Sequence, residues 1–532
     1  MSLDRPNLIS FQSLRRILLS VLTAFILLKL ISSLVGTFDR PQIQGKFELY
    51  QTNLVLVASE WKPTEDLEGL GALQTSIVGT DILKSATQQY QNARSSDVLA
   101  IEKLKTSLAG LGSAESNANT KESLALQTNL INKTIAAAQL EIERIDLRIG
   151  ILQAANKQPE QAIVTWHKVI TDASRSTSKN VAASLIGIWQ KSASIDRHTL
   201  PQIKAEITTN FDGWFRDRIL TQVYTDLDDR PELDKLAIAE QLKAKNALIK
   251  LALITIPRVL LGVSGVFLLV FFIVRLIIIA IQQRKERSVP EILLANLNPW
   301  QTPWDWEIVW QVFVVGFFFV GQFLLPAIFS ILVEPATLTT RGQGLYVFSS
   351  YVLMASLGIG VLFLSIKSYM PLPPDWFKFN WRSNWLLWGI GGYLIATPIV
   401  IVVSLINDKI WHGQGGSNPL LQIVLEDRDS TALVLFFVTA AVAAPLFEEF
   451  LFRGFLLPSL TRYVPVWGAI AISGLVFGVA HLSLSEILPL TTLGIILGIV
   501  YVRTRNLLAP MLLHSLWNST TLASLFILGS GN

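Results

Sequence analysis

The chain has no cysteine among its 532 residues, and only 16% of its residues are charged, where soluble domains carry about 25%. The absence of cysteine excludes disulfides, thiolate metal sites, iron–sulfur ligation and a cysteine nucleophile. A formal net charge of +4 is too small to argue for nucleic-acid binding. With 51% hydrophobic residues and a mean hydropathy of +0.45, a single water-soluble globule is excluded. Any catalysis must come from carboxylates, histidines, hydroxyls or amines.

Long apolar runs account for most of the hydrophobic residues. A bilayer core of about 30 Å takes roughly 20 apolar residues of helix. Nine candidate runs cover residues 17–35, 259–281, 308–333, 346–366, 385–406, 433–457, 464–482, 487–502 and 507–528. No small-residue cleavage pattern follows the first run, which favours an uncleaved anchor over a secretory signal. The sequence therefore predicts an all-α, polytopic membrane helix bundle of about nine spans.

Residues 37–250 are more polar, and their apolar residues recur at helical spacing. They predict a soluble helical domain inserted between spans 1 and 2. Within it, Leu147, Gly150, Ala162 and Trp166 have the offsets of a tetratricopeptide unit. No clean 34-residue repeat accompanies them. A helical hairpin or coiled-coil-like domain is therefore favoured over a repeat array, which stays open.

The lysines and arginines of the short loops fall mainly on one side if the spans alternate. This predicts a protein of the cell membrane with a cytoplasmic N-terminus and an extracytoplasmic helical domain. The predicted parts are a cytoplasmic tail with its membrane anchor (1–36), the helical domain (37–250), spans 2–5 with their loops (251–425) and a catalytic membrane domain (426–532). Five tryptophans are typical of the headgroup boundary: Trp300, Trp304, Trp306, Trp376 and Trp381.

Ionisable side chains are concentrated in the last four spans. At the bilayer centre such a side chain costs from about 2.5 to above 10 kcal/mol, so it is a functional candidate by default. The candidates, with one nearby amide, are Glu448, Glu449, Arg453, His481, His514 and Asn518. Any one of them alone could be a structural residue. Together, in order on successive spans, they predict a functional site.

Spacing along each helix assigns partners within this set. Glu449 and Arg453 are four residues apart and should form a charge-neutralising pair on one helix face. Glu448 points about 100° away and is predicted to be the free carboxylate. His514 and Asn518 are also four residues apart, so an imidazole and an amide project together as hydrogen-bond donors.

The depth of each group follows from counting residues to the nearest turn. With a turn near residue 464, Glu448 lies 16 residues before it and His481 lies 17 residues after it. At about 1.5 Å per residue, the carboxylate and the imidazole should come level on adjacent antiparallel helices. His514 starts closer to its own turn, and it is the least consistent member of the set.

A carboxylate, two imidazoles and an amide in a protein-lined cavity suit hydrolysis. Glu448 would take a proton from water that His481 holds and polarises. His514 and Asn518 would donate hydrogen bonds to the oxyanion. Glu448, His481 and His514 also match the two-His-one-Glu set of zinc hydrolases, but without their HExxH helix. Metal-free activation of water is slightly favoured, and one zinc ion remains the alternative cofactor.

The same motifs resemble the CPBP family, which comprises type II CAAX prenyl proteases, bacteriocin-processing proteins and Abi self-immunity proteins. The resemblance rests on Glu-Glu-x-x-x-Arg at 448–453, Phe-x-x-x-His at 477–481 and His-x-x-x-Asn at 514–518, and it covers roughly residues 430–528. It implies an intramembrane endopeptidase of glutamate or metallo type. It also implies roles: Glu448 as the water-activating residue, His481 as its partner, His514 and Asn518 on the oxyanion side, and Glu449 and Arg453 as support.

Two classes of function remain. The leading hypothesis is a membrane-embedded peptidase that acts on a membrane-associated protein or peptide, with the helical domain recruiting or gating substrates. The alternative is a non-catalytic membrane scaffold or immunity-type protein that binds a protein partner through its helical domain. A transporter that uses Glu448 as a proton relay is less favoured. The lipid bilayer is a partner in every case, and nucleic acid is not.

Overall fold

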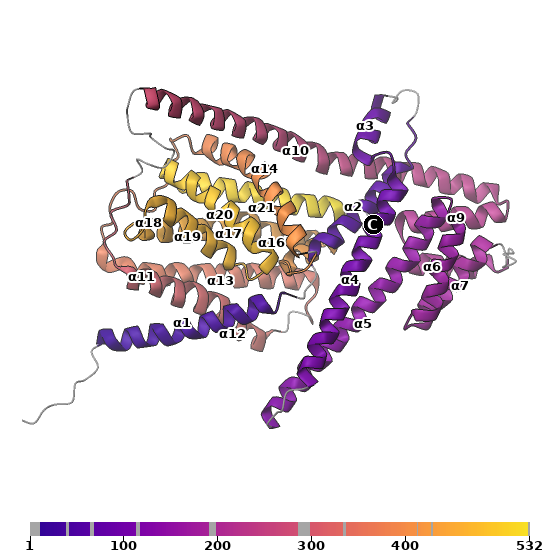
Figure 1. Cartoon of the computed structure of the whole chain (residues 1–532), viewed down its shortest axis with the longest axis horizontal. Helices are drawn as coiled ribbons and strands as arrows, with labels where there is room; N and C mark the ends of the chain where they lie inside the picture. The colour runs from indigo at the N-terminus through magenta and orange to yellow at the C-terminus, as the bar shows by residue number, and fades with distance from the viewer. Residues whose placement is uncertain are drawn as a thin grey trace, which may run out of the picture. The chain divides into compact units, whose positions relative to one another are not determined.

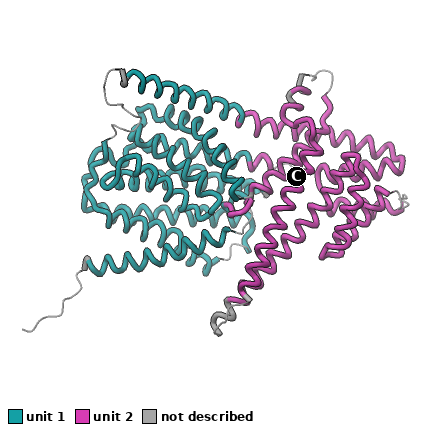
Figure 2. Tube along the Cα trace, viewed as in Figure 1, with its two compact units in different colours: residues 1–38, 259–411, 418–524 teal, residues 39–258, 412–417, 525–532 magenta. Residues whose placement is uncertain are grey.

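A computed structural model of the chain describes residues 11–38, 42–63, 69–112, 118–190, 198–285, 298–333, 337–411, 413–426 and 429–529. Throughout these ranges the regular elements are helices, and none is a strand. Two compact units can be distinguished (Figure 2). The membrane unit comprises residues 1–38, 259–411 and 418–524, and the helical unit comprises residues 39–258, 412–417 and 525–532. The predicted all-α class is confirmed.

The helical unit is built from consecutive helices that carry apolar residues on their packed faces. They are α2 (Ile43–Ser59), α3 (Gly69–Val78), α4 (Ile82–Gly112), α5 (Ala118–Ala155), α6 (Pro159–Asp172), α7 (Ser176–Gln190), α8 (Leu200–Asn210) and α9 (Gly213–Asp226), followed by the first part of α10 (Arg230–Lys285) (Figure 1). Its core contains Tyr90, Leu152, Trp166 and Phe215, which are almost fully buried.

The α5–α6 hairpin contains the tetratricopeptide-like residues. Lys157 in the connecting turn has a φ of 60°, which reverses the chain after α5. Trp166 is fully buried, and its indole N–H donates to the carbonyl of Leu147 over 3.1 Å. The indole lies directly over Gly150, where a Cβ would stand 2.2 Å from Nε1. Gly150 therefore gives the Trp166 ring the space that it needs.

Gly150→Ala should destabilise the helical unit by about 1–3 kcal/mol, because the added methyl overpacks the hairpin and displaces Trp166. The measurement is urea unfolding of the full chain, followed by tryptophan fluorescence. Gly45→Ala in α2 is the matched control, since no atom lies within 4 Å of the added Cβ, and helix propensity favours alanine by about 0.5–1 kcal/mol. Equal stability of the two variants would contradict this packing.

The membrane unit contains the helices long and apolar enough to cross a bilayer. Its elements are α1 (Phe11–Val35), α11 (Trp306–Gln311), η2 (Val312–Leu324), α12 (Leu325–Leu332), α13 (Thr340–Ile366), η4 (Lys367–Tyr369), α14 (Trp385–Trp411), α15 (Pro419–Glu426), α16 (Ser430–Val438), η5 (Thr439–Ala443), α17 (Ala444–Glu449), η6 (Phe450–Leu456), α18 (Leu457–Leu460), α19 (Val466–Val479), α20 (Leu484–Thr504) and α21 (Leu508–Gly529), with the second part of α10. In the described part of the chain, eight continuous helical segments qualify by length and composition. These segments make the chain a multi-pass membrane protein.

One of the nine expected spans, the seventh along the chain, differs from its prediction. The apolar run at 464–482 forms α19, which has only 14 residues. At about 1.5 Å per residue this helix is roughly 21 Å long and falls short of the 30 Å hydrocarbon core. The run includes residues of the turns on both sides of the helix, and hydropathy alone does not distinguish them from helical residues.

One segment, Ser430–Leu460, changes its winding along its length. Asp429 caps its start by accepting the backbone N–H of Ala432. This hydrogen bond, followed by the ion pair with Arg341, holds the pKa of the Asp429 carboxyl below its usual range. Two π-helical turns, η5 and η6, flank the short helix α17. Such turns shift the backbone hydrogen bonds and occur often at functional sites.

The tryptophans divide into two groups. Trp300, Trp304 and Trp376 are nearly fully buried in the core of the membrane unit, whereas Trp306 and Trp381 are 49% and 70% exposed. The prediction of boundary anchors is therefore wrong for the first three. Their indole N–H groups donate to protein groups, as Trp304 does to Ser459 Oγ over 2.9 Å, so burial leaves no indole donor unpaired.

Candidate active site

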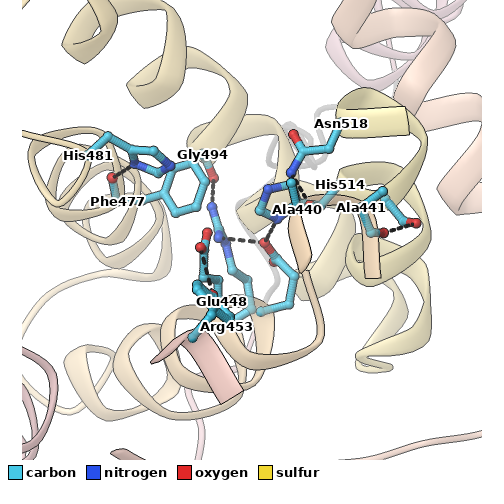
Figure 3. Close-up of polar contacts among 12 residues, drawn as sticks. Ala440, Ala441, Glu448, Arg453, Phe477, His481, Gly494, His514 and Asn518 are labelled. Atoms are coloured by element: carbon cyan, nitrogen blue, oxygen red, sulfur yellow. Dashed lines mark hydrogen bonds and ion pairs between the residues drawn. The ribbon is translucent and has the colours of Figure 1, made fainter. Parts of the chain in front are cut away.

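The predicted site residues come from three segments of the membrane unit. Glu448 and Glu449 end α17, and Arg453 lies in the following π-turn η6. His481 lies in the turn after α19, beyond the end of that helix at Val479. His514 and Asn518 lie on α21. Figure 3 labels Glu448, Arg453, His481, His514 and Asn518, which come from these three segments.

A buried ion network occupies the centre of the site. Glu449 Oε1 accepts hydrogen bonds from Arg453 Nη1 at 2.8 Å and from His514 Nδ1 at 2.9 Å. Glu449 and Arg453 are fully buried, and His514 is 3% exposed. The predicted Glu449–Arg453 pair is confirmed. The structure adds His514, which binds this supporting glutamate and not the free one.

Close helix packing supplies a second acceptor for Arg453. Its Nη2 donates to the carbonyl of Gly494 on α20 over 3.0 Å. A Cβ on Gly494 would lie 2.8 Å from the Cα of Gly474 on α19 and 3.3 Å from Arg453 Nη2. Glycines at this crossing let α19 and α20 approach closely, as is common between membrane helices. The guanidinium is thereby enclosed by protein.

The ring of Phe477 connects the three sequence motifs. The guanidinium carbon of Arg453 lies 4.6 Å from the ring centroid, in the range of a cation–π contact. The rings of His481 and His514 pack edge-on against it, with centroid distances of 4.9 Å and 5.5 Å. One fully buried phenyl ring therefore contacts a residue from each motif. The structure brings Arg453, His481 and His514 together as expected.

Glu448 differs from its prediction as a carboxylate without a partner. Its Oε1 accepts a hydrogen bond from the hydroxyl of Tyr351 on α13 over 3.1 Å (Figure 3 labels the carboxylate). Its Oε2 is buried and has no hydrogen-bond partner among the described residues. Buried polar atoms normally have partners, so an orphaned carboxylate oxygen is unusual. Glu449 Oε2 is also buried without a partner among the described residues, but the Glu449 carboxylate is paired with Arg453, whereas no ion pair of Glu448 is found in the described part of the chain.

The His481 ring is oriented by a backbone carbonyl of the preceding helix, α19. Its Nδ1 lies 2.8 Å from the carbonyl oxygen of Phe477, which can only accept a hydrogen bond. Nδ1 therefore carries a proton, and in the neutral ring Nε2 is an acceptor. In the described part of the chain no hydrogen bond joins His481 to Glu448. Counting residues predicted that the two groups lie at the same depth, but it did not predict that His481 lies beyond the end of α19.

The turn that carries His481 is tied to other segments. Leu482 has a φ of 57°, which turns the chain after the histidine. Asn407 at the end of α14 donates to the carbonyl of Ser485 over 2.7 Å, and Glu486 accepts the backbone N–H of Asn418 over 3.0 Å. The position of the imidazole therefore depends on contacts outside its own motif.

Asn518 is placed by the π-turn η5. Its Nδ2 donates to the carbonyl of Ala440 over 2.7 Å, and Ser515 donates to the carbonyl of Ala441. In a π-turn the carbonyls are displaced from the usual i to i+4 pairing, so these two are available to α21. One N–H of the Asn518 amide is used in this way, and the second stays available as a donor.

The alternative of one zinc ion concerns the histidines and carboxylates of the site. Among the described residues no group of three or more histidines and carboxylates is arranged to hold a metal. Nδ1 of His514 faces Glu449, and Nδ1 of His481 faces a backbone carbonyl. Glu448 is directed to Tyr351. These contacts engage Nδ1 of each ring and leave Nε2 as the free ring nitrogen, an arrangement also common in zinc-binding histidines. The zinc site therefore stays a prediction, and no chemical step is routed through a metal.

Comparison with known proteins shows what the segment that carries the site is similar to. Residues 430–520 match the family described as "Type II CAAX prenyl endopeptidase Rce1-like". The chain is 25% identical over 134 residues to the "Putative membrane peptidase YdiL" of Bacillus subtilis, an alignment that covers 25% of this chain and 54% of that protein. It is 28% identical over 137 residues to the "Membrane-embedded CAAX protease MroQ" of Staphylococcus aureus, covering 25% and 54%.

A third relative is the "Uncharacterized 24.3 kDa protein" of Escherichia coli, 34% identical over 115 residues that cover 21% of this chain and 52% of that protein. The chain thus spans about half the length of the curated relatives it matches. No solved structure matches the chain. The matched segment contains all three motifs, together with the Glu449–Arg453–His514 network. Residues 430–520 are therefore similar to the type II CAAX prenyl endopeptidase, Rce1-like family.

Proposed function

We propose that the chain is an intramembrane endopeptidase in which Glu448 activates water for hydrolysis of a peptide bond. The observation that carries this proposal is the buried, unpartnered Oε2 of Glu448, whose carboxylate, unlike that of Glu449, has no ion pair among the described residues. Glu448 lies on the same short helix, α17, as Glu449. Glu449 pairs with Arg453, which contacts the Phe477 ring. A strong acceptor without a partner, beside two histidines and an amide, suits proton abstraction from water.

In the proposed reaction, water binds between Glu448 Oε2 and the Nε2 of His481. Glu448 takes one proton as the water oxygen attacks the carbonyl carbon of the peptide. The tetrahedral intermediate then loses its C–N bond, and the proton passes from Glu448 to the departing amine. The products are a carboxylic acid and an amine, so one water molecule is consumed and Glu448 is regenerated.

The oxyanion is stabilised from α21. The second N–H of Asn518 is one donor. Since Nδ1 of His514 already donates to Glu449, His514 needs a second proton to donate from Nε2. The Glu449 carboxylate faces the ring and stabilises such an imidazolium electrostatically. Glu449 and Arg453 thus support the oxyanion side and do not touch the substrate. Donors of this kind contribute about 10²–10³ to kcat.

The substrate class follows from the location of the site on helices of a membrane bundle. We propose a membrane-associated protein or peptide as substrate, reached from within the bilayer. Residues 37–250 are proposed to be extracytoplasmic and to recruit or gate the substrate, and the N-terminus is proposed to be cytoplasmic. These assignments rest on the loop charges and on the apolar helices that surround the site.

The alternative is a scaffold that binds a protein partner without cleaving it. The observation that favours it is that Glu449 bonds both Arg453 and His514, as residues that only hold a bundle together do. The scaffold does not account for the orphaned oxygen of Glu448. It remains the second candidate because binding through the helical unit needs no catalytic group.

The test uses the purified full chain in liposomes with a library of membrane-tethered peptides. Mass spectrometry identifies new termini, before and after treatment with a metal chelator. The proposal expects cleavage of at least one peptide at a rate that the chelator leaves unchanged. Loss of cleavage on chelation, with recovery on addition of zinc, would overturn the metal-free mechanism. Peptide binding without any cleavage would favour the scaffold.

A further inference from the structure

Tyr351 lies at the middle of α13, outside the segment that matches the family. Gly344, Tyr351 and Gly358 follow one another at intervals of seven residues. Residues seven apart lie on nearly the same face of a helix. This face of α13 therefore carries glycine, which has no side chain, at two positions and the phenol of Tyr351 midway between them.

The two glycines set how closely α13 approaches the helix that carries Glu448. A Cβ on Gly344 would lie 3.1 Å from the Cα of Ala432, and a Cβ on Gly358 would lie 3.0 Å from the ring of Phe447. Glycines at such positions allow membrane helices to pack closely. The approach brings the Tyr351 hydroxyl within 3.1 Å of Glu448 Oε1.

Ring packing fixes the phenol in turn. The rings of Tyr351 and Phe447 meet edge to face, with centroids 6.3 Å apart. Phe447 precedes Glu448 in the sequence, is 4% exposed and stacks against Phe317. The same short helix therefore holds both the ring that packs on Tyr351 and the carboxylate that accepts its hydrogen bond.

Glu448 has a competing partner inside the site. Glu448 and Arg453 lie five residues apart on one continuous helical segment, and the Nε of Arg453 is buried without a hydrogen-bond partner among the described residues. Glu449 already neutralises Arg453 through Nη1. Without a hydroxyl on α13, the Glu448 carboxylate would gain by turning to the guanidinium. The carboxylate oxygens of Glu448 would then be engaged in an ion pair with Arg453.

We propose that Tyr351 is a positioning residue that holds Glu448 away from Arg453 and keeps Oε2 open to water. This inference rests on the proposed function, because it concerns the same base. The single hydroxyl occupies Oε1, which leaves one oxygen of the carboxylate for the proton. The site therefore extends beyond residues 430–520 to α13. Tyr351 touches neither water nor substrate and acts through Glu448.

Tyr351→Phe should lower kcat by about 10- to 100-fold, the effect expected when a reacting group is displaced by about 1 Å. KM should change less than about twofold, since no substrate contact is lost. Tyr346→Phe is the matched control: it removes the same atom from the same helix, and the Tyr346 hydroxyl has no hydrogen bond among the described residues, its ring packing on Phe329. The assay is cleavage of the tethered peptide in liposomes.

A second measurement separates positioning from general stability. The Tm losses of Tyr351→Phe and Glu448→Ala, measured singly and together, should not add if the two side chains interact, because each change removes the hydrogen bond between them. Additive losses of Tm together with a kcat equal to that of Tyr346→Phe would overturn the inference. Undiminished cleavage by Glu448→Gln would instead overturn the proposed function itself, so the two failures are distinguishable.

Discussion

Replacing Glu448 by glutamine should lower kcat for the tethered peptide by about 10²–10⁴-fold, the range that a general base contributes. Glutamine has nearly the same shape, and its carbonyl oxygen still accepts the hydrogen bond from Tyr351. The side chain loses only its ability to take a proton. The fold should therefore be kept, and KM should change little. Initial rates in liposomes, with circular dichroism for the fold, give the measurement.

The control for this variant is Glu307→Gln in α11. Glu307 is also a buried glutamate of the membrane unit, 6% exposed and paired with Arg16, and it is not part of the site. Its exchange should leave kcat within about twofold. An equal loss of kcat in both variants would show that any buried glutamate matters to folding. Undiminished turnover by Glu448→Gln would refute the role of Glu448 as base.

Arg453→Ala should be the most destabilising single change in the site, at about 3–5 kcal/mol. It leaves Glu449 fully buried, with its countercharge gone and with only His514 as partner. Breaking a buried ion pair on one side has this cost because one charge stays uncompensated in a medium of low dielectric constant. The free energy of unfolding in mixed micelles, from titration with sodium dodecyl sulfate, measures the effect.

The double variant Glu449→Gln with Arg453→Met is the control for that prediction. It removes both charges and fills the volume, so it should recover much of the stability that Arg453→Ala loses. Catalysis should stay low, because His514 loses the carboxylate that supports it. If the double variant were less stable than Arg453→Ala, desolvation of a lone charge would not be the reason for the loss.

Local spacing predicted the parts of the site that lie within one helical turn. The Glu449–Arg453 ion pair follows from residues four apart, even though the chain winds as a π-helix there. Phe477 and His481 are also four apart, and the histidine bonds the phenylalanine carbonyl. Such contacts depend on the backbone of one segment, which the sequence specifies directly.

Contacts between segments could not be predicted in the same way. Tyr351 is 97 residues from Glu448, and nothing in the motif indicates which earlier helix approaches it. The signal was present as glycines seven residues to either side of Tyr351, but small residues occur in many membrane helices. His514 was expected on the oxyanion side, and its bond to Glu449 depends on the relative depth of α17 and α21.

Composition also gave wrong predictions for features that depend on tertiary contacts. A run of apolar residues indicates length only when all of it is helical, and the turns around α19 are apolar too. Tryptophan suits the headgroup boundary, but it is equally suited to a core that supplies an acceptor for its N–H. Trp304 has such an acceptor in Ser459. The fold class depended on neither detail and was predicted correctly.

The most direct test of the account is a single turnover in water labelled with ¹⁸O, using the chain in liposomes and a cleavable tethered peptide. If Glu448 activates water, the new carboxyl terminus should carry one ¹⁸O atom, and mass spectrometry of the digested protein should find no label in Glu448. Label in the Glu448 carboxyl, or an unlabelled product terminus, would mean that the carboxylate attacks the peptide itself and would contradict the assignment of Glu448 as a base.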